Sequence, residues 1–147
     1  MVTLFIPLET RPGEARVALD PGTAQTLGSK LGLTVRVQSG AGAAAGYTDA
    51  AYTQAGAQIV PDAASGCAGA DLVASVAPPD LAGQGIAALS RGTVLITSVQ
   101  PTVDTELVEA LKGRGVTLLS SDLIPRISRA QSMDVLSSQA TVAGYHA

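Results

Sequence analysis

A polar stretch near the end of the chain combines side chains that could bind one ligand together. It reads PRISRAQSMDVLSS, from Pro125 to Ser138. Arginine supplies a cation with several N–H donors, glutamine an amide, and aspartate and serine supply acceptors. Such a set suits an anionic or an amide-bearing ligand. The candidate residues are Arg126, Gln131, Asp134 and Ser137.

The spacing of these residues allows two interpretations. If a helix begins near Ser132, Asp134 lies in its first turn, where the helix dipole favours a carboxylate. Ser137 then lies about one turn further along, on a nearby face. The side chains could converge on a ligand, or the segment could be a capped helix whose preceding loop is polar. The residues alone leave both interpretations open.

A glycine-rich segment, GAGAAAG, is a second candidate. Gly40, Gly42 and Ala45 match the G-x-G-x-x-A pattern of dinucleotide-binding turns, and Asp62 follows at about the expected distance. In that pattern the last position lies inside the helix that the turn opens. Here the next helix, with Asp49 as its expected cap, begins only later. We therefore interpret the segment as a plain loop.

A charged segment follows the first expected strand. Arg11, Glu14 and Arg16 lie within ETRPGEARVAL. They predict either a solvated loop with a surface ion pair or an arginine that faces a ligand crevice. Nothing in the spacing decides between the two.

The reactive side chains are few. Cys67 is the sole cysteine, lies between small residues, and is interpreted as a buried structural thiol on a helix. His146 is the sole histidine and is interpreted as a solvated residue at a helix end. A triad with histidine or a zinc site is therefore not expected, and no metal is expected.

Composition indicates one globular domain. Of the 147 residues, 46% are hydrophobic and 14% charged, which excludes a disordered chain. The net charge of −3 and the scattered basic residues argue against a nucleic-acid partner. We find neither a signal peptide nor an apolar run long enough to span a membrane. A single cysteine fits a reducing compartment.

Short apolar runs alternate with alanine-rich segments of helical period, which predicts a parallel sheet covered on both faces. The expected fold is a three-layer α/β/α domain with a mainly parallel, Rossmann-like (flavodoxin-like) sheet. Ligands of such sheets lie beyond the carboxyl ends of the strands, and the polar stretch directly follows the last strand. The expected strands are Thr3–Leu8, Thr34–Ser39, Gln58–Val60, Asp71–Ala77, Thr93–Val99 and Val116–Ser121. The expected helices are Pro21–Gly32, a segment from Asp49 to Gly56, Val103–Gly115 with Val103, Leu107, Ala110 and Leu111 on one face, and a last helix from Ser132.

Several long segments carry a resemblance to a known family. IPLETRPGEARVALDPGTAQTL, VQSGAGAAAGYTDAAYTQAGAQIV, TSVQP and PRISRAQSMDVLSS occur in order and cover essentially the whole chain. The sequence resembles the start of the alpha subunit of proton-translocating NAD(P) transhydrogenases. The resemblance implies an oxidoreductase component that binds NAD(H) between two Rossmann-like halves. Residues 1–147 correspond to the first half, and the Gly-rich second half is absent from this chain.

The resemblance also implies roles for the polar stretch. Arg126, Asp134 and Ser137 are expected to position the nicotinamide and its carboxamide. Gln131 is expected to lie towards NADP(H) on a partner subunit, to which hydride passes directly. Alignment of the two rings then replaces acid–base catalysis, and Gln131, Arg126 and Asp134 are the residues expected to matter for it.

Alanine dehydrogenases share this N-terminal fold, and two positions argue against that activity. Where they place a lysine and a histidine for the keto acid, this chain has Ser75 and Gln100. Arg16 does not discriminate, because both families have an arginine there. A catalytically silent binding or assembly module is the remaining alternative.

The resemblance extends to partners and location. It implies the second half of the NAD-binding component, the NADP-binding and membrane domains of the transhydrogenase, and a homodimer. The chain is then expected in the cytoplasm, peripheral at the inner face of the cell membrane through its partner subunits, and inactive when isolated.

Overall fold

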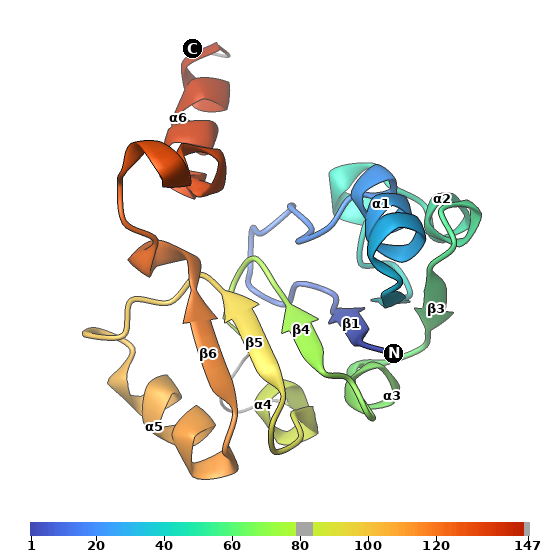
Figure 1. Cartoon of the computed structure of the whole chain (residues 1–147), viewed down its shortest axis with the longest axis horizontal. Helices are drawn as coiled ribbons and strands as arrows, with labels where there is room; N and C mark the ends of the chain where they lie inside the picture. Colours follow the sequence, from blue (N-terminus) through green and yellow to red (C-terminus); the bar gives the residue numbers. More distant parts are fainter. Residues whose placement is uncertain (79–83, 146–147) are drawn as a thin grey trace.

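The computed structural model describes residues 1–78 and 84–145. In this portion of the chain six strands form one sheet, and every neighbouring pair is parallel. The sheet runs in the order β3-β2-β1-β4-β5-β6 (Figure 1). The strands are β1 Thr3–Ile6, β2 Thr34–Gln38, β3 Gln58–Val60, β4 Leu72–Ala74, β5 Val94–Thr97 and β6 Thr117–Ser120.

This order confirms the predicted fold class. It is the Rossmann order, in which the direction of winding reverses between the first and fourth strands. Without the three-residue edge strand β3, the other five follow the flavodoxin order. Several strands are shorter than expected; β1, for example, ends at Ile6, before Pro7. Proline has no N–H to donate to the ladder, which explains that end.

Helices cover both faces of the sheet. Leu4 and Ile6 point into one core with residues of α1 (Pro21–Leu31) and α2 (Asp49–Gln54). Phe5 points the other way, into a core with α3, α4 and α5. The second set of helices comprises α3 Ala63–Cys67, α4 Gln84–Ala88 and α5 Thr105–Arg114. Alternate residues of a strand face opposite sides, so one β-strand serves both cores.

Some helix ends agree with the sequence and others differ from it. Gly32 ends α1 and Gly115 ends α5 in the left-handed region, at φ 68° and 70°, as predicted. The expected cap Asp49 is wrong by one residue, because the Thr48 hydroxyl accepts the N–H of Ala51. Val103 lies outside α5 and is 71% exposed, so it does not share the buried face of Leu107.

The last helix also begins later than predicted. The segment Ser128–Met133 forms tight 3₁₀ turns, and α6 spans Val135–Tyr145. Figure 1 shows α6 beyond the arrowheads of β4, β5 and β6, away from the layers that cover the sheet. The polar stretch therefore connects the sheet to a projecting helix.

We predict that Gly66→Ala destabilises the fold. A Cβ at Gly66 would lie 2.1 Å from the ring of Phe5, a side chain that is fully buried. Overpacking of this kind costs about 1–3 kcal/mol. The control is Gly113→Ala in α5, where a Cβ meets nothing within 4 Å and should stabilise the helix by about 0.5–1 kcal/mol. Urea unfolding of both variants measures the difference; equal stability would contradict the packing argument.

Candidate functional site

The four predicted residues lie around one cavity. It has a volume of about 380 Å³ and is formed by the turns after β6 and the first turn of α6. The segments converge because the 3₁₀ turns bring the chain back towards the start of the helix. Its lining residues are Arg126, Ile127, Ser128, Ala130, Gln131, Asp134 and Ser137.

Asp134 holds the start of α6 in place. Its carboxylate accepts the N–H of Ser137 at 3.1 Å and the hydroxyl of Ser137 at 2.6 Å. The Ser137 hydroxyl is the main cause that lowers the pKa of Asp134, with smaller contributions from the Ser137 N–H and the charge of Arg126. Asp134 therefore precedes the helix as its cap, and the expected place in the first turn is wrong. The capped-helix interpretation is correct, and the four side chains also line one cavity, while their convergence on a ligand stays a prediction.

Arg126 and Gln131 remain available to a ligand. Both are exposed, and within residues 1–78 and 84–145 neither side chain forms a hydrogen bond to the protein. The cavity thus presents an unpaired guanidinium and an unpaired amide beside an ordered carboxylate. A carboxamide needs donors and acceptors, and an anion needs cations, so the donor set suits an anionic or an amide-bearing ligand.

A serine network fixes the chain that leads to this cavity. Ser120, the last residue of β6, donates its hydroxyl to the carbonyl of Val99 at 2.6 Å and accepts the N–H of Val99 at 3.2 Å. The hydroxyl of Ser98 bonds to Ser121 and to Asp122, each at 3.0 Å. These contacts tie the ends of β5 and β6 together. The sequence interpretation missed them, although the SSD run after a strand was a visible signal.

The loop after β1 contains the predicted ion pair and also lines a crevice. Arg16 pairs with Glu14 at 2.6 Å, and Arg16 lowers the pKa of Glu14 to about 2. Arg11, Glu14 and Arg16 also line a crevice of about 650 Å³ at the carboxyl ends of β4 and β5, together with Gln100 and Asp122. The loop therefore has the ion pair and also faces a crevice.

The two positions that distinguish alanine dehydrogenases are occupied by neutral side chains. The hydroxyl of Ser75 donates to Thr97 at 3.0 Å, and Thr97 is almost fully buried. Gln100 lines the polar crevice, and its backbone N–H is accepted by Asp104. Neither position supplies a cation or an imidazole.

The glycine-rich segment is a loop, as predicted. Its middle forms a 3₁₀ turn, Ala43–Ala45, and α2 begins only at Asp49. The Asp49 carboxylate accepts the N–H of Gly40 at 2.9 Å, so that N–H is not available to a phosphate. Asp62 caps α3 through the N–H of Ser65. Gly42 is required for packing, because a Cβ there would lie 2.7 Å from the ring of Tyr52.

The remaining candidates behave as structural residues or lie outside the described residues. Cys67 is buried at the end of α3, and burial raises the pKa of its thiol to about 11. His146 is not among the described residues. The described portion of the chain contains no cluster of three or more metal-binding side chains. In the same portion, no helix is long and apolar enough to cross a bilayer.

Fold and site together define a Rossmann-like α/β domain with a polar cavity beyond the carboxyl edge of its sheet. Residues 5–143 match the model of the alanine dehydrogenase/PNT N-terminal domain. The chain belongs to this family. The predicted resemblance and fold are thereby confirmed.

Individual relatives point to the transhydrogenase branch. The chain is 45% identical over 141 residues to NAD(P) transhydrogenase subunit alpha of Cereibacter sphaeroides, covering 96% of the chain and 26% of the relative. It is 46% identical over 147 residues to an NAD(P) transhydrogenase alpha-subunit protein of Rhodospirillum rubrum, covering 98% and 38%. A crystal structure of transhydrogenase from Sinorhizobium meliloti matches with a TM-score of 0.90 and 40% identity, covering 97% and 42%. The chain thus spans well under half the length of these relatives.

We predict that Ser137→Ala raises the pKa of Asp134 towards its ordinary value of 3.8. The hydroxyl at 2.6 Å favours the charged carboxylate, and its removal leaves only the backbone N–H. Because the folded pKa is lowered, the stabilisation by this pair is present above the unfolded pKa and lost as pH falls through the folded one. Carbon-detected NMR titration of the carboxyl group measures the shift.

The matched control is Ser138→Ala. The Ser138 hydroxyl donates to the carbonyl of Val135 and does not touch the Asp134 carboxylate. The pKa of Asp134 should be unchanged in this variant. An equal rise in both variants would show that helix fraying, rather than the Ser137 hydroxyl, controls the carboxylate.

Proposed function

We propose that this chain belongs to the NAD(H)-binding component of a proton-translocating NAD(P) transhydrogenase. The observation that supports it best is the convergence of Arg126, Gln131, Asp134 and Ser137 on one cavity. Relatives named as transhydrogenase alpha subunits match nearly the whole chain, which supports the same assignment. The enzyme passes hydride between NADH and NADP⁺ and couples this to proton movement; the chain contributes to it only within the full complex.

Each side chain has a role suited to its chemistry. The Arg126 guanidinium, the Asp134 carboxylate and the Ser137 hydroxyl hold the nicotinamide ring and its carboxamide. Asp134 is ordered before any ligand arrives, because Ser137 already fixes it. Gln131, exposed on the same cavity, lies towards the NADP(H) of the partner subunit. NAD(H) belongs to this component and NADP(H) to the partner.

The proposed reaction needs no acid or base from this chain. Bound nicotinamides supply the hydride chemistry, and the protein supplies orientation. Within the described residues the cavity holds no histidine or cysteine, and its carboxylate is kept ionised by Ser137. Alignment by fixed hydrogen bonds accounts for the residues that are present.

Amino-acid dehydrogenation is the weaker alternative. Alanine dehydrogenase of Bacillus subtilis is 33% identical over 95% of the chain, so the fold alone permits it. Reduction of a keto acid needs a cation and a proton donor beside the carbonyl. Ser75 and Gln100 provide neither, and the Ser75 hydroxyl is engaged by Thr97. The remaining alternative is a catalytically silent binding or assembly module. Hydride-transfer rates in the assembled enzyme distinguish it from the main proposal.

Exposed apolar surface supports a further half in the functional protein. Ile96 and Leu119 are paired in adjacent strands and are 37% and 52% exposed. The helix α6 buries none of its residues within the described structure. We propose that a Gly-rich nucleotide-binding half covers this surface. Homodimerisation and peripheral attachment to the inner face of the cell membrane, through the NADP-binding and membrane domains, belong to the same proposal.

The test is hydride transfer in the assembled enzyme. Gln131→Asn shortens the side chain by one methylene and keeps its amide. We expect single-turnover hydride transfer to slow by about a hundredfold, because displacement of about 1 Å can cost that much. Arg126→Ala and Asp134→Asn should slow transfer and also weaken NADH binding, since each removes a charged hydrogen bond.

Arg129→Ala is the matched control. Arg129 lies three residues after Arg126 and has the same charge, but it does not line the cavity. This variant should transfer hydride at the parent rate. If Gln131→Asn, Arg126→Ala and Asp134→Asn all match the parent as well, the segment only caps a helix and the silent-module alternative stands.

A further inference from the structure

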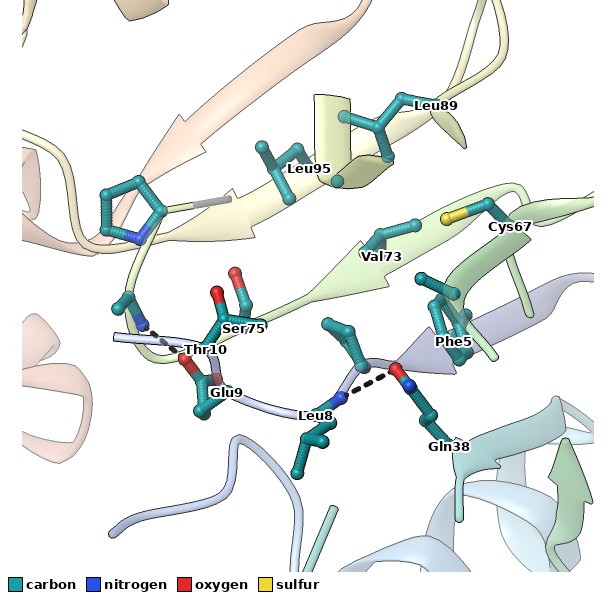
Figure 2. A pocket seen from close by; sticks show the side chains of 15 residues that line it. Phe5, Leu8, Glu9, Thr10, Gln38, Cys67, Val73, Ser75, Leu89 and Leu95 are labelled. Carbon is teal, nitrogen blue, oxygen red and sulfur yellow. Dashed lines mark hydrogen bonds between the residues drawn. The ribbon is translucent and has the colours of Figure 1, made fainter. Parts of the chain in front are cut away.

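Glu9 connects the two strands between which the winding of the sheet reverses. It follows β1, and its carboxylate reaches the chain that follows β4. One oxygen accepts the N–H of Val76 at 2.6 Å, and the other accepts the N–H of Ala77 at 3.1 Å. Figure 2 shows Glu9 on the loop after Phe5, with a dashed line to the neighbouring backbone. Both oxygens of one carboxylate are therefore bound by consecutive amides, 67 and 68 residues away in sequence.

The position of this contact matters as much as its geometry. In open α/β sheets, ligands bind outside the carboxyl ends of the strands at the point where the order reverses. Here that point lies between β1 and β4. Successive backbone N–H groups also form concavities that bind anions. We infer that the amides of Val76 and Ala77 form a carboxylate-binding site at the switch point, which the chain fills with its own Glu9.

Burial and neighbouring charges have opposing effects on the pKa of Glu9. The carboxylate is half-buried, and burial raises its pKa while the two N–H groups lower it less strongly. Glu14 raises the pKa further, and Arg16 lowers it. The two amides would lose their acceptors without Glu9, and an unsatisfied buried donor costs free energy. The contact therefore satisfies both amides from within the chain.

This occupancy has a consequence for the adjacent loop. Thr10, Arg11 and Arg16 line the polar crevice beside Val76 and Ala77. Glu9 fixes the start of that loop to the chain that follows β4. Its hydrogen bonds therefore hold one wall of the crevice in place. The amides of Val76 and Ala77 are therefore not available to another anion unless it displaces Glu9.

The test is chemical complementation of Glu9→Ala in the whole chain. The substitution removes a CH₂–COO⁻ group, and acetate restores the same atoms. We expect the melting temperature of Glu9→Ala to fall by about 5 °C, a shift typical of losing a pair of hydrogen bonds in a domain of this size. Acetate should raise it again with saturation, because a ligand that binds only the folded state stabilises it by mass action.

Four controls make the result specific. Acetamide has the same shape without the charge, and chloride at equal ionic strength has the charge without the shape; neither should restore stability. Glu9→Gln fills the space with a neutral amide, so acetate should leave it unchanged. Asp62→Ala removes an exposed carboxylate that caps α3 through Ser65, and acetate should not restore that variant either.

The outcomes separate the site from a packing effect. Saturable recovery of Glu9→Ala by acetate alone, with NMR shifts at the Val76 and Ala77 amides, supports the inference. Equal recovery by acetamide would show that Glu9 only fills space. No recovery by acetate, or recovery without amide shifts, would overturn the site. If Glu9→Ala is unfolded in plain buffer, the same series is read as recovery of folding.

Discussion

A parallel sheet with both faces buried imposes the arrangement on which the rest of this molecule depends. Every strand needs apolar residues on both sides, and every return connection must cross a face. Alternate residues of β1 therefore serve two separate cores, with Phe5 in one and Leu4 and Ile6 in the other. All strands also end at the same edge. The loops free to do chemistry gather there, which places Glu9, Ser120 and the segment from Arg126 along one edge.

Polar contacts at this edge act at different levels. The side chains of Glu9 and Ser120 form hydrogen bonds to backbone groups far away in sequence. These bonds fix the shape of the edge and leave neither side chain available to a ligand. Part of the hydrogen-bonding capacity of Asp134 is already used, because its carboxylate caps α6 through Ser137. Arg126 and Gln131 remain unpaired within the described residues. The cavity around Arg126 is the candidate for a nucleotide because the four residues that the resemblance implies all line it.

Local signals in the sequence were sufficient for much of this. Hydrophobic alternation predicted the sheet, the glycine at position 32 predicted the end of α1, and the distance from the glycine-rich segment to the next helix predicted a loop. The prediction that Val103 lies in the helix was wrong, because the helical spacing of apolar residues does not show where a helix begins. The partners of Glu9 and Ser120 could not be predicted, because they lie after strands distant in sequence and depend on strand order, although the SSD run at the end of β6 was a visible signal. The roles of Arg126 and Gln131 came from resemblance, and their shared cavity came from the structure.

Titration of the chain with NADH, followed by amide NMR shifts, tests the assignment of the nucleotide cavity without any other subunit. We expect weak binding, because the glycine-rich segment of this chain is a loop whose first amide is already bound by Asp49, with shifts concentrated at residues 126–137. Titration with AMP, which lacks the nicotinamide, should not produce those shifts. A dissociation constant in the low micromolar range, about −8 kcal/mol, would contradict the expected weak binding. Shifts centred on the loop from Gly40 to Gly46 would contradict it as well, since they would place the nucleotide at the other candidate site.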